Sequence, residues 1–222
     1  APFSSILRGF ILPKFFLENC GAYLAAIRSI GRTEEYFYMP VFESAAMIPP
    51  QTRREALTEV RAQLDTVSGS ILNIRVGGND LSHAFGLRRP ANRTIYDLRP
   101  VADILIDIVA AFGTQYVVSG PVWEYYSGEG WEEGLRREME LDLLNGFTGK
   151  TVIHPNQIPV VNEMLRVSQR DYADARAILN WDTGSGSLVS ASEDGGRMNE
   201  YNTHSRWARR IVLRAERYGV RA

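Results

Sequence analysis

Two carboxylates of the sequence each follow a short apolar run. Glu43 follows residues 36–42, and Asp80 follows residues 70–76 after two glycines. If both runs are strands of one parallel sheet, the carboxylates lie on the same rim although 37 positions separate them. Two carboxylates together with water molecules suit magnesium, which seldom has an all-protein cage. The alternative is that each carboxylate caps a following helix or pairs with an arginine.

The stretch RVGGNDLS, residues 75–82, places Gly77 and Gly78 directly before Asn79 and Asp80. Glycine lets the backbone approach a ligand closely or adopt a positive φ. Asn79 is placed to orient Asp80 through a hydrogen bond. We therefore expect this strand end to be a binding position.

Other polar residues occupy similar places along the chain. Lys14 and Ser119 end two further apolar runs, and Arg88 follows the glycine stretch. Lys14 would form an ion pair with Glu43 or bind a substrate carboxylate, and the ion pair is the favoured interpretation. Arg88 would meet a phosphate of coenzyme A or of a nucleotide, or remain an exposed loop arginine.

The elements that position these residues follow from hydrophobic periodicity. Apolar runs alternate with segments of helical period, which indicates βα units and a parallel sheet. The predicted strands are residues 9–12, 36–42, 70–76, 115–119 and 151–154. One predicted helix begins at a capping box over residues 52–55, and the others cover residues 98–112, 131–144, 157–165, 168–180 and 203–218. Five βα units are fewer than a closed (β/α)8 barrel needs, so part of the barrel is missing or the sheet is open.

The pattern changes after the last predicted strand. We expect a barrel portion over residues 1–165 and an all-helical extension over residues 166–222. The extension contains the Gly- and Ser-rich segment 182–196, which is expected to be a mobile loop.

Composition excludes several classes of partner. The 222 residues carry 25 Lys and Arg against 26 Asp and Glu, a net charge of -1, so no general attraction to nucleic acid or an anionic membrane is implied. No stretch has the roughly 18 apolar residues of a membrane span. The single cysteine, Cys20, rules out an internal disulfide and fits a reducing compartment. We therefore expect a cytoplasmic protein with a small-molecule partner.

Several segments resemble the HpcH/HpaI aldolase and citrate lyase β-subunit superfamily. They are ILPKF at 11–15, MPVFESA at 39–45, IRVGGNDLSHAFGLRR at 74–89, GKTVIHPNQIPVVNE at 149–163 and GGRMNEYNTHSRWARRIVLRAERYG at 195–219. The most similar branch comprises the citrate-lyase-like proteins that accompany phosphoribosyltransferases in bacterial tellurite- and stress-resistance loci. The resemblance implies a TIM (β/α)8 barrel of the phosphoenolpyruvate/pyruvate type, an α/β fold of which this chain covers about strands 4 to 8 plus C-terminal helices.

The resemblance also implies an activity. It is that of a magnesium-dependent carbon–carbon lyase, which cleaves a hydroxy or oxo acid, or its coenzyme A thioester, by retro-aldol or retro-Claisen chemistry while the metal stabilises an enolate. Glu43 and Asp80 then correspond to the two metal ligands, and relatives assemble as trimers or hexamers. The further candidates are Gly77, Gly78, Asn79, Arg88 and Ser119 for substrate or cofactor binding, and Lys14 and Glu200 for catalysis.

Glu200 stands where the superfamily has an acid/base aspartate. It would transfer protons from a lid formed by the Gly- and Ser-rich segment, or face solvent together with Asn199. By the same resemblance, His154 before a proline is favoured as a structural turn residue over a general base.

Two other functions stay open at the level of sequence. One is a thioesterase-type hydrolase that uses the same metal site. The other is a non-catalytic ligand-binding or scaffold barrel subunit. Convergent carboxylates argue against the scaffold, whereas the absence of the first three barrel strands from the alignment argues for it.

Overall fold

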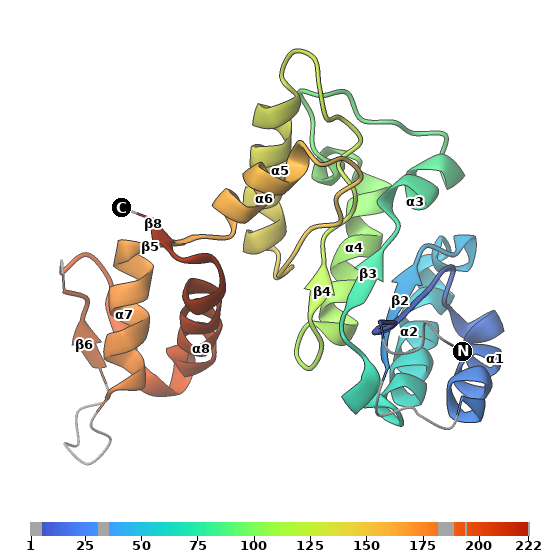
Figure 1. Cartoon of the computed structure of the whole chain (residues 1–222), viewed down its shortest axis with the longest axis horizontal. Helices are drawn as coiled ribbons and strands as arrows, with labels where there is room; N and C mark the ends of the chain where they lie inside the picture. The colour runs from blue at the N-terminus through green and yellow to red at the C-terminus, as the bar shows by residue number, and fades with distance from the viewer. Residues whose placement is uncertain (1–5, 31–35, 182–188, 194, 222) are drawn as a thin grey trace. The chain divides into compact units, whose positions relative to one another are not determined.

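The computed structural model describes residues 6–30, 36–181, 189–193 and 195–221 of the chain. They belong to two compact units, Ala1–Val160 and Val161–Ala222 (Figure 1). The sequence-based boundary lies after residue 165, and the observed one lies after Val160. Across the described residues, no helix combines the length and apolar character needed to cross a membrane.

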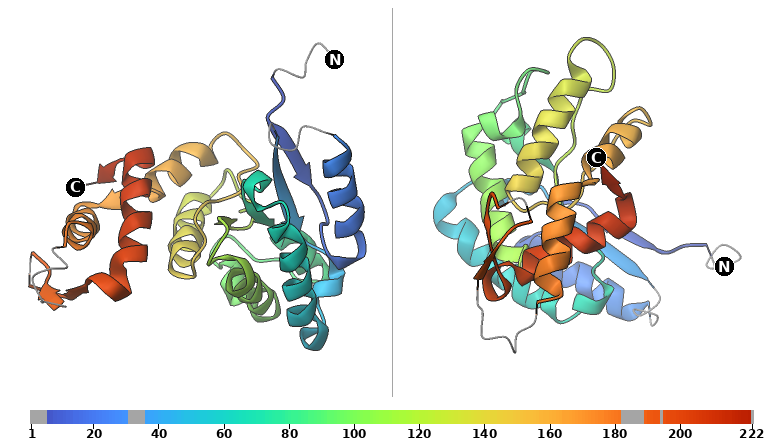
Figure 2. Two further views of the ribbon diagram at one scale, coloured as in Figure 1. Left: turned by 90° about the horizontal axis from the view of Figure 1, so that it is seen from below. Right: turned by 90° about the vertical axis from the view of Figure 1, so that its left-hand side faces the viewer.

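The first unit contains a parallel four-stranded sheet in the order β1-β2-β3-β4. Its strands are β1 (Gly9–Leu12), β2 (Phe37–Phe42), β3 (Ile74–Val76) and β4 (Val118–Ser119). The helices that follow or connect them are α1 (Leu17–Ser29), α2 (Pro50–Asp65), α3 (Gly78–Ala84), α4 (Arg99–Phe112) and α5 (Trp131–Leu144). The predicted α/β fold with a parallel sheet is thus confirmed, and Figure 2 shows α1 running alongside the strands.

The two faces of the sheet differ because side chains alternate along a strand. One face carries Tyr38, Phe42, Ile74, Val76 and Val118, which are buried in one hydrophobic core with residues of α1, α2 and α4. The second face carries Ile11, Phe37, Arg75, Val117 and Ser119, as the register between the strands requires. Ile11, Phe37 and Val117 are exposed on that second face.

Several strand predictions are too long. The run 70–76 divides into the 3-10 helix η3 (Ser68–Ser70) and β3, which has three residues. The predicted strand 151–154 is not formed. The chain before it, residues 148–151, runs parallel to residues 118–120 through three backbone hydrogen bonds and the bridge between Gly120 and Lys150. Apolar composition alone does not decide the length of a strand, because pairing depends on the neighbouring chain.

Helix starts depend on local chemistry that the sequence partly shows. The capping box expected over residues 52–55 is wrong, because α2 begins at Pro50, whose missing N–H costs nothing in the first turn. Leu57, Val60 and Leu64 form its buried stripe. In the second unit, Ser168 caps α7 (Gln169–Leu179) by accepting a hydrogen bond from the backbone N–H of Asp171, at the predicted start of the helix over residues 168–180.

A buried ionic cluster fixes α5 to the chain around it. Lys150 Nζ donates to Glu138 Oε1 and to Asp142 Oδ2, both at 2.7 Å. Arg89 Nε lies 3.0 Å from Glu138 Oε2, and Tyr96 donates its hydroxyl proton to Asp142. The Lys150, Glu138 and Asp142 side chains are almost entirely removed from solvent, so each buried charge has an opposite charge beside it.

The second unit is not all-helical, contrary to expectation. It contains α7, α8 (Tyr201–Tyr218), the parallel pair β5 (Val167–Ser168) and β8 (Val220–Arg221), and the antiparallel pair β6 (Val189–Ala191) and β7 (Met198–Glu200). Helix α6 (Gln157–Met164) precedes them along the chain. The predicted loop 182–196 therefore includes a strand, because backbone pairing with β7 outweighs the turn-forming composition around β6. Residues 182–188 and 194 lie outside the described residues.

Candidate metal and substrate site

Glu43 and Asp80 both lie at the carboxyl ends of adjacent parallel strands. Phe42 pairs with Val76 in the register of β2 and β3, so the two strands end at the same level. Glu43 follows β2 directly, and Asp80 lies in the first turn of α3, which begins two residues after β3. One residue contacts both carboxylates: Lys14 donates its backbone N–H to Glu43 Oε1 at 3.0 Å and its ammonium to Asp80 Oδ1 at 2.6 Å.

Lys14 has a left-handed backbone, with φ of 50°, which is uncommon for a residue other than glycine. The conformation directs the backbone N–H and the side chain to two different carboxylates. The hydrogen bond and the charge of Asp80 raise the pKa of Lys14 above its ordinary 10.5, with a smaller contribution from Glu43. The expected ion pair between Lys14 and Glu43 is therefore corrected: the ammonium binds Asp80, and Glu43 is bound by the backbone.

The two consecutive glycines have different surroundings. A Cβ atom at Gly77 would overlap Glu43 Oε2 and Cβ, so this carboxylate occupies the space that a side chain would fill. A Cβ atom at Gly78 would lie 2.5 Å from Ile95 Cδ1 and 2.7 Å from Pro121 Cβ. Gly77 thus makes room at the carboxylates, whereas Gly78 makes room for apolar packing.

The carboxylate pair has the chemistry of a magnesium site. In the described part of the chain, no group of three or more His, Cys, Asp or Glu side chains is placed to hold a metal. A cation at Glu43 and Asp80 would take two protein ligands and complete its octahedron with oxygen from water or substrate, which is usual for magnesium. The Asp80 side chain is about half exposed, at 47%, so a cation can reach it from solvent. The donor set and the solvent access of Asp80 both fit a hard divalent cation.

Asn79 and Arg88 line one cavity of about 350 Å³ beside α3, together with Ser82, His83 and Glu124. Arg88 is exposed, and its Nε lies 3.5 Å from Glu124 Oε1. The expected hydrogen bond from Asn79 to Asp80 does not occur among the described contacts. The structure therefore brings two of the binding candidates together at a cavity that Asp80 itself does not line.

The other candidates lie elsewhere. Ser119 is buried on the second face of the sheet, where its Oγ accepts a hydrogen bond from Asn73 Nδ2 at 2.7 Å. Glu200 belongs to the second unit and precedes α8, with its backbone N–H donating to His204 Nδ1. Asn199 is buried against Asp174, so the solvent-facing alternative is wrong for this residue.

His154 has the contacts of a turn residue. Its ring stacks on Tyr126 with centroids 4.2 Å apart, and its Nδ1 accepts a hydrogen bond from the backbone N–H of Asn156. Asn156 in turn donates its side-chain amide to the carbonyl of Tyr126. These contacts support the structural interpretation of the histidine.

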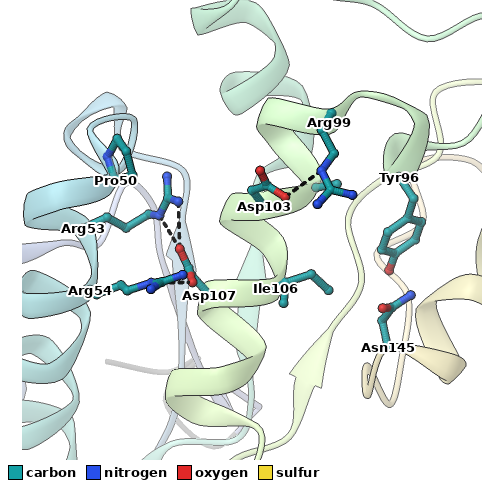
Figure 3. Close-up of a pocket in the computed structure, with 10 residues that line it drawn as sticks. Pro50, Arg53, Arg54, Tyr96, Arg99, Asp103, Ile106, Asp107 and Asn145 are labelled. Atoms are coloured by element: carbon teal, nitrogen blue, oxygen red, sulfur yellow. Dashed lines mark hydrogen bonds and ion pairs between the residues drawn. The ribbon is translucent and has the colours of Figure 1, made fainter.

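A larger cavity of about 600 Å³ lies along α2 and α4 (Figure 3). Arg53 and Arg54 both point at Asp107, and Arg99 points at Asp103. Arg53 and Arg54 share the single carboxylate of Asp107, so the lining has three arginines against two aspartates. Each arginine is held by an ion pair, and none of the residues chosen from the sequence lines this cavity.

Comparison with known proteins identifies the family. The family of carbon–carbon bond lyases of the TIM-barrel fold matches residues 2–220. The chain belongs to this family. The match covers almost all of the chain, both units included, and agrees with the parallel sheet of the first unit.

The similarity to individual proteins is lower in identity or in coverage. The L-malyl-CoA/β-methylmalyl-CoA lyase of Cereibacter sphaeroides is 38% identical over 74 residues, which are 32% of this chain and 22% of that protein. The CitE protein of Mycobacterium tuberculosis, solved with magnesium, acetoacetate and coenzyme A, has a TM-score of 0.59 at 20% identity, over 93% of this chain and 77% of that one. A citrate lyase from Burkholderia xenovorans has a TM-score of 0.67 at 16% identity, over 97% and 65%.

The sequence left the direction of one charged residue of β3 open. Arg75 lies on the second face of the sheet, between the buried residues Ile74 and Val76. The alternation along β3 shows that Arg75 faces away from Ile74 and Val76. Which of the two faces is buried is decided only when the helices cover one of them.

Proposed function

We propose that this chain carries the metal-binding rim of a magnesium-dependent carbon–carbon lyase. The substrate would be a hydroxy or oxo acid or its coenzyme A thioester, cleaved by retro-aldol or retro-Claisen chemistry. The observation that carries the proposal is the convergence of Glu43 and Asp80 on Lys14 at the ends of two adjacent parallel strands. Active sites of βα barrels lie at this end of the strands.

Each residue of the rim has a role that follows from its contacts. Glu43 and Asp80 would hold the cation through carboxylate oxygens. When bound, magnesium supplies Lewis-acid stabilisation of the negative charge that develops as the carbon–carbon bond breaks. Lys14 acts as a positioning residue, because its backbone N–H and ammonium fix the two carboxylates and its raised pKa keeps it protonated.

The proposed substrate class rests on what two similar proteins act on or bind. The Cereibacter protein is named as a lyase of acyl-CoA thioesters, and the Mycobacterium protein was solved with an oxo acid and coenzyme A. The cavity lined by Asn79 and Arg88 lies along α3, the helix that also carries Asp80, which suits it to a phosphate or the pantetheine arm of such a thioester. Acid/base catalysis by Glu200 from a lid stays a prediction.

Calorimetric titration with magnesium tests the metal site in the full chain. Glu43→Gln and Asp80→Asn should each weaken magnesium binding by about tenfold or more, because each removes a charged oxygen ligand. Asp103→Asn is the matched control, since Asp103 is an exposed carboxylate paired with Arg99 on α4. Unchanged magnesium affinity in both rim variants would contradict the proposal.

A panel of hydroxy acids and their coenzyme A thioesters tests the reaction. We expect an aldehyde, an oxo acid or a coenzyme A product that requires magnesium and is lost in Glu43→Gln. Magnesium binding without any such product would instead favour the binding-subunit alternative.

Assembly and location also stay predictions. We propose a homo-oligomer, a trimer or hexamer, and a cytoplasmic protein of a bacterial tellurite-resistance locus. Sedimentation of the full chain would test the assembly, and a monomer at assay concentrations would contradict it.

A further inference from the structure

The second face of the sheet carries a positive charge for which none of the described residues supplies a carboxylate. Arg75 is half-buried on this face, and its described contact is a hydrogen bond from Nη2 to Thr151 Oγ1 at 3.3 Å. Other partly or fully buried cations of this unit, such as Arg53, Arg89 and Lys150, are each paired with a carboxylate. Arg75 therefore has the charge and the donors to bind an anion that the described chain does not provide.

The register of the strands shows in which direction Arg75 extends. Arg75 pairs with Ser119 of β4, and the next residue, Gly120, pairs with Lys150. Because these segments are parallel, Thr151 lies two residues nearer the carboxyl end than Arg75 does. The guanidinium contacts Thr151, so the side chain leans toward the rim that carries the carboxylates.

Glu43 lies at the same level of the sheet as Thr151. Arg75 also pairs with Val41 of β2, so Glu43 is two residues beyond the level of Arg75. Gly77 follows the last residue of β3, two positions beyond Arg75, and the space of its missing side chain is occupied by the Glu43 carboxylate. The guanidinium and the carboxylate rim thus adjoin one region of the second face.

The distance across the sheet between Glu43 and Thr151 indicates the size of ligand that would fit between them. Three strand spacings of about 4.8 Å separate β2 from the segment that contains Thr151, which gives roughly 14 Å between backbones. The Glu43 carboxylate lies at Gly77 and the Arg75 guanidinium reaches Thr151, so the interval between the two groups is on the scale of a short-chain acid. Lys14 does not compete for this role, because its ammonium is paired with Asp80.

We propose that Arg75 binds a second carboxylate of the substrate, so that the protein selects short dicarboxylic acids over monocarboxylic acids of the same length. This inference rests on the proposed function, because the first carboxylate and its neighbouring oxygen would lie at the cation held by Glu43 and Asp80. Arg75 is then a binding residue that determines specificity, since its planar guanidinium pairs with a carboxylate through two hydrogen bonds.

Malate and 2-hydroxybutyrate form a matched pair of probes. Both have a 2-hydroxy acid end, and they differ only in a carboxylate or a methyl group at the other end. In calorimetric titrations of the full chain at fixed magnesium, we expect malate to bind about tenfold more tightly or better. Equal affinity for the two acids, or no detectable binding of malate, would overturn the proposal.

Substitution of Arg75 tests whether it causes this preference. Arg75→Met should remove the preference: the affinity for malate should fall about tenfold, while the affinity for 2-hydroxybutyrate should change less than about twofold. Arg75→Lys should retain part of the preference for malate. Arg99→Met, on α4, is the matched control and should retain all of it. An unchanged preference in Arg75→Met, or an equal loss of affinity for both acids, overturns the role. If Arg75→Met does not fold, Arg75→Lys decides, and an unchanged preference in Arg75→Lys overturns the role.

Titration with magnesium alone separates the two proposals. If magnesium does not bind but the malate preference depends on Arg75, the metal proposal fails and the role of Arg75 stands. If magnesium binds through Glu43 and Asp80 but Arg75→Met leaves the ratio of the two acids unchanged, only the role of Arg75 fails.

Discussion

The buried cluster around Lys150 allows a quantitative test of how α5 is held. Lys150→Met removes the cation that lies 2.7 Å from both Glu138 and Asp142, inside a region closed to solvent. Arg89 still neutralises Glu138, but Asp142 then keeps only the hydrogen bond from Tyr96. Methionine has a similar length, so the substitution removes the charge with little loss of volume.

Breaking a buried ion pair from one side typically costs about 3–5 kcal/mol of the free energy of unfolding. At roughly 2–4 °C per kcal/mol for a chain of this size, the Tm should fall by roughly 6–20 °C. Urea unfolding followed by circular dichroism measures the free energy, and a thermal scan measures the Tm. Arg99→Met removes an exposed pair on α4 and should cost less than about 1 kcal/mol.

Acid should reduce the deficit of Lys150→Met. Burial raises the pKa of Asp142 above its ordinary 3.8, while Lys150 acts to lower it. The folded protein therefore favours the protonated carboxyl, and the ionised form costs stability as the pH rises through the raised pKa. Removing Lys150 raises this pKa further, so the deficit relative to wild type should shrink as the pH falls from neutral toward 3.8.

A double variant completes this test. Lys150→Met combined with Asp142→Asn should be more stable than the sum of the single losses predicts, because the unpaired charge is gone. A loss below about 1 kcal/mol in Lys150→Met, or a deficit that does not depend on pH, would refute the reasoning.

Three further predictions concern local contacts. Gly77→Ala should displace Glu43 and weaken magnesium binding in calorimetry, whereas Gly69→Ala, with open space at its Cβ position, should not; equal affinities would contradict the steric role of Gly77. The pKa of Lys14, followed by NMR, should lie above 10.5 in wild type and fall in Asp80→Asn, and an unchanged pKa would show that the ion pair does not form in solution. Ser168→Ala should lower the free energy of unfolding by about 0.5–2 kcal/mol in urea titrations because α7 loses its cap, and no change would mean that water replaces the hydroxyl.

Much of the fold could be predicted because its signals are local. The helical periods over residues 98–112 and 131–144 predicted α4 and α5 to within one residue, because the period depends on residues three and four apart in the chain. Strand ends were predicted less well, since β3 and β4 depend on pairing with neighbouring chain. The strand within the Gly- and Ser-rich segment was missed because its partner β7 is needed to form it.

Part of the candidate site could likewise be predicted from the sequence, and part could not. Glu43 and Asp80 could be chosen because both follow apolar runs, and parallel strands place their carboxyl ends on one rim. The contact of Lys14 with both carboxylates could not be predicted. It requires a left-handed backbone, and a lysine in the sequence does not indicate one. Which glycine makes room for Glu43 was also undecided until the packing of Ile95 and Pro121 against Gly78 was visible.

The amino-acid sequence by itself determined the alternation of strands and helices, the near-zero net charge and the pair of acidic residues at strand ends. These properties depend on neighbours along the chain or on composition. Only the tertiary structure decided that Lys14 joins the two carboxylates and that Arg75 points to the second face. The physical reason is that the direction of a side chain on a strand depends on which face the helices cover, and this is a property of distant residues.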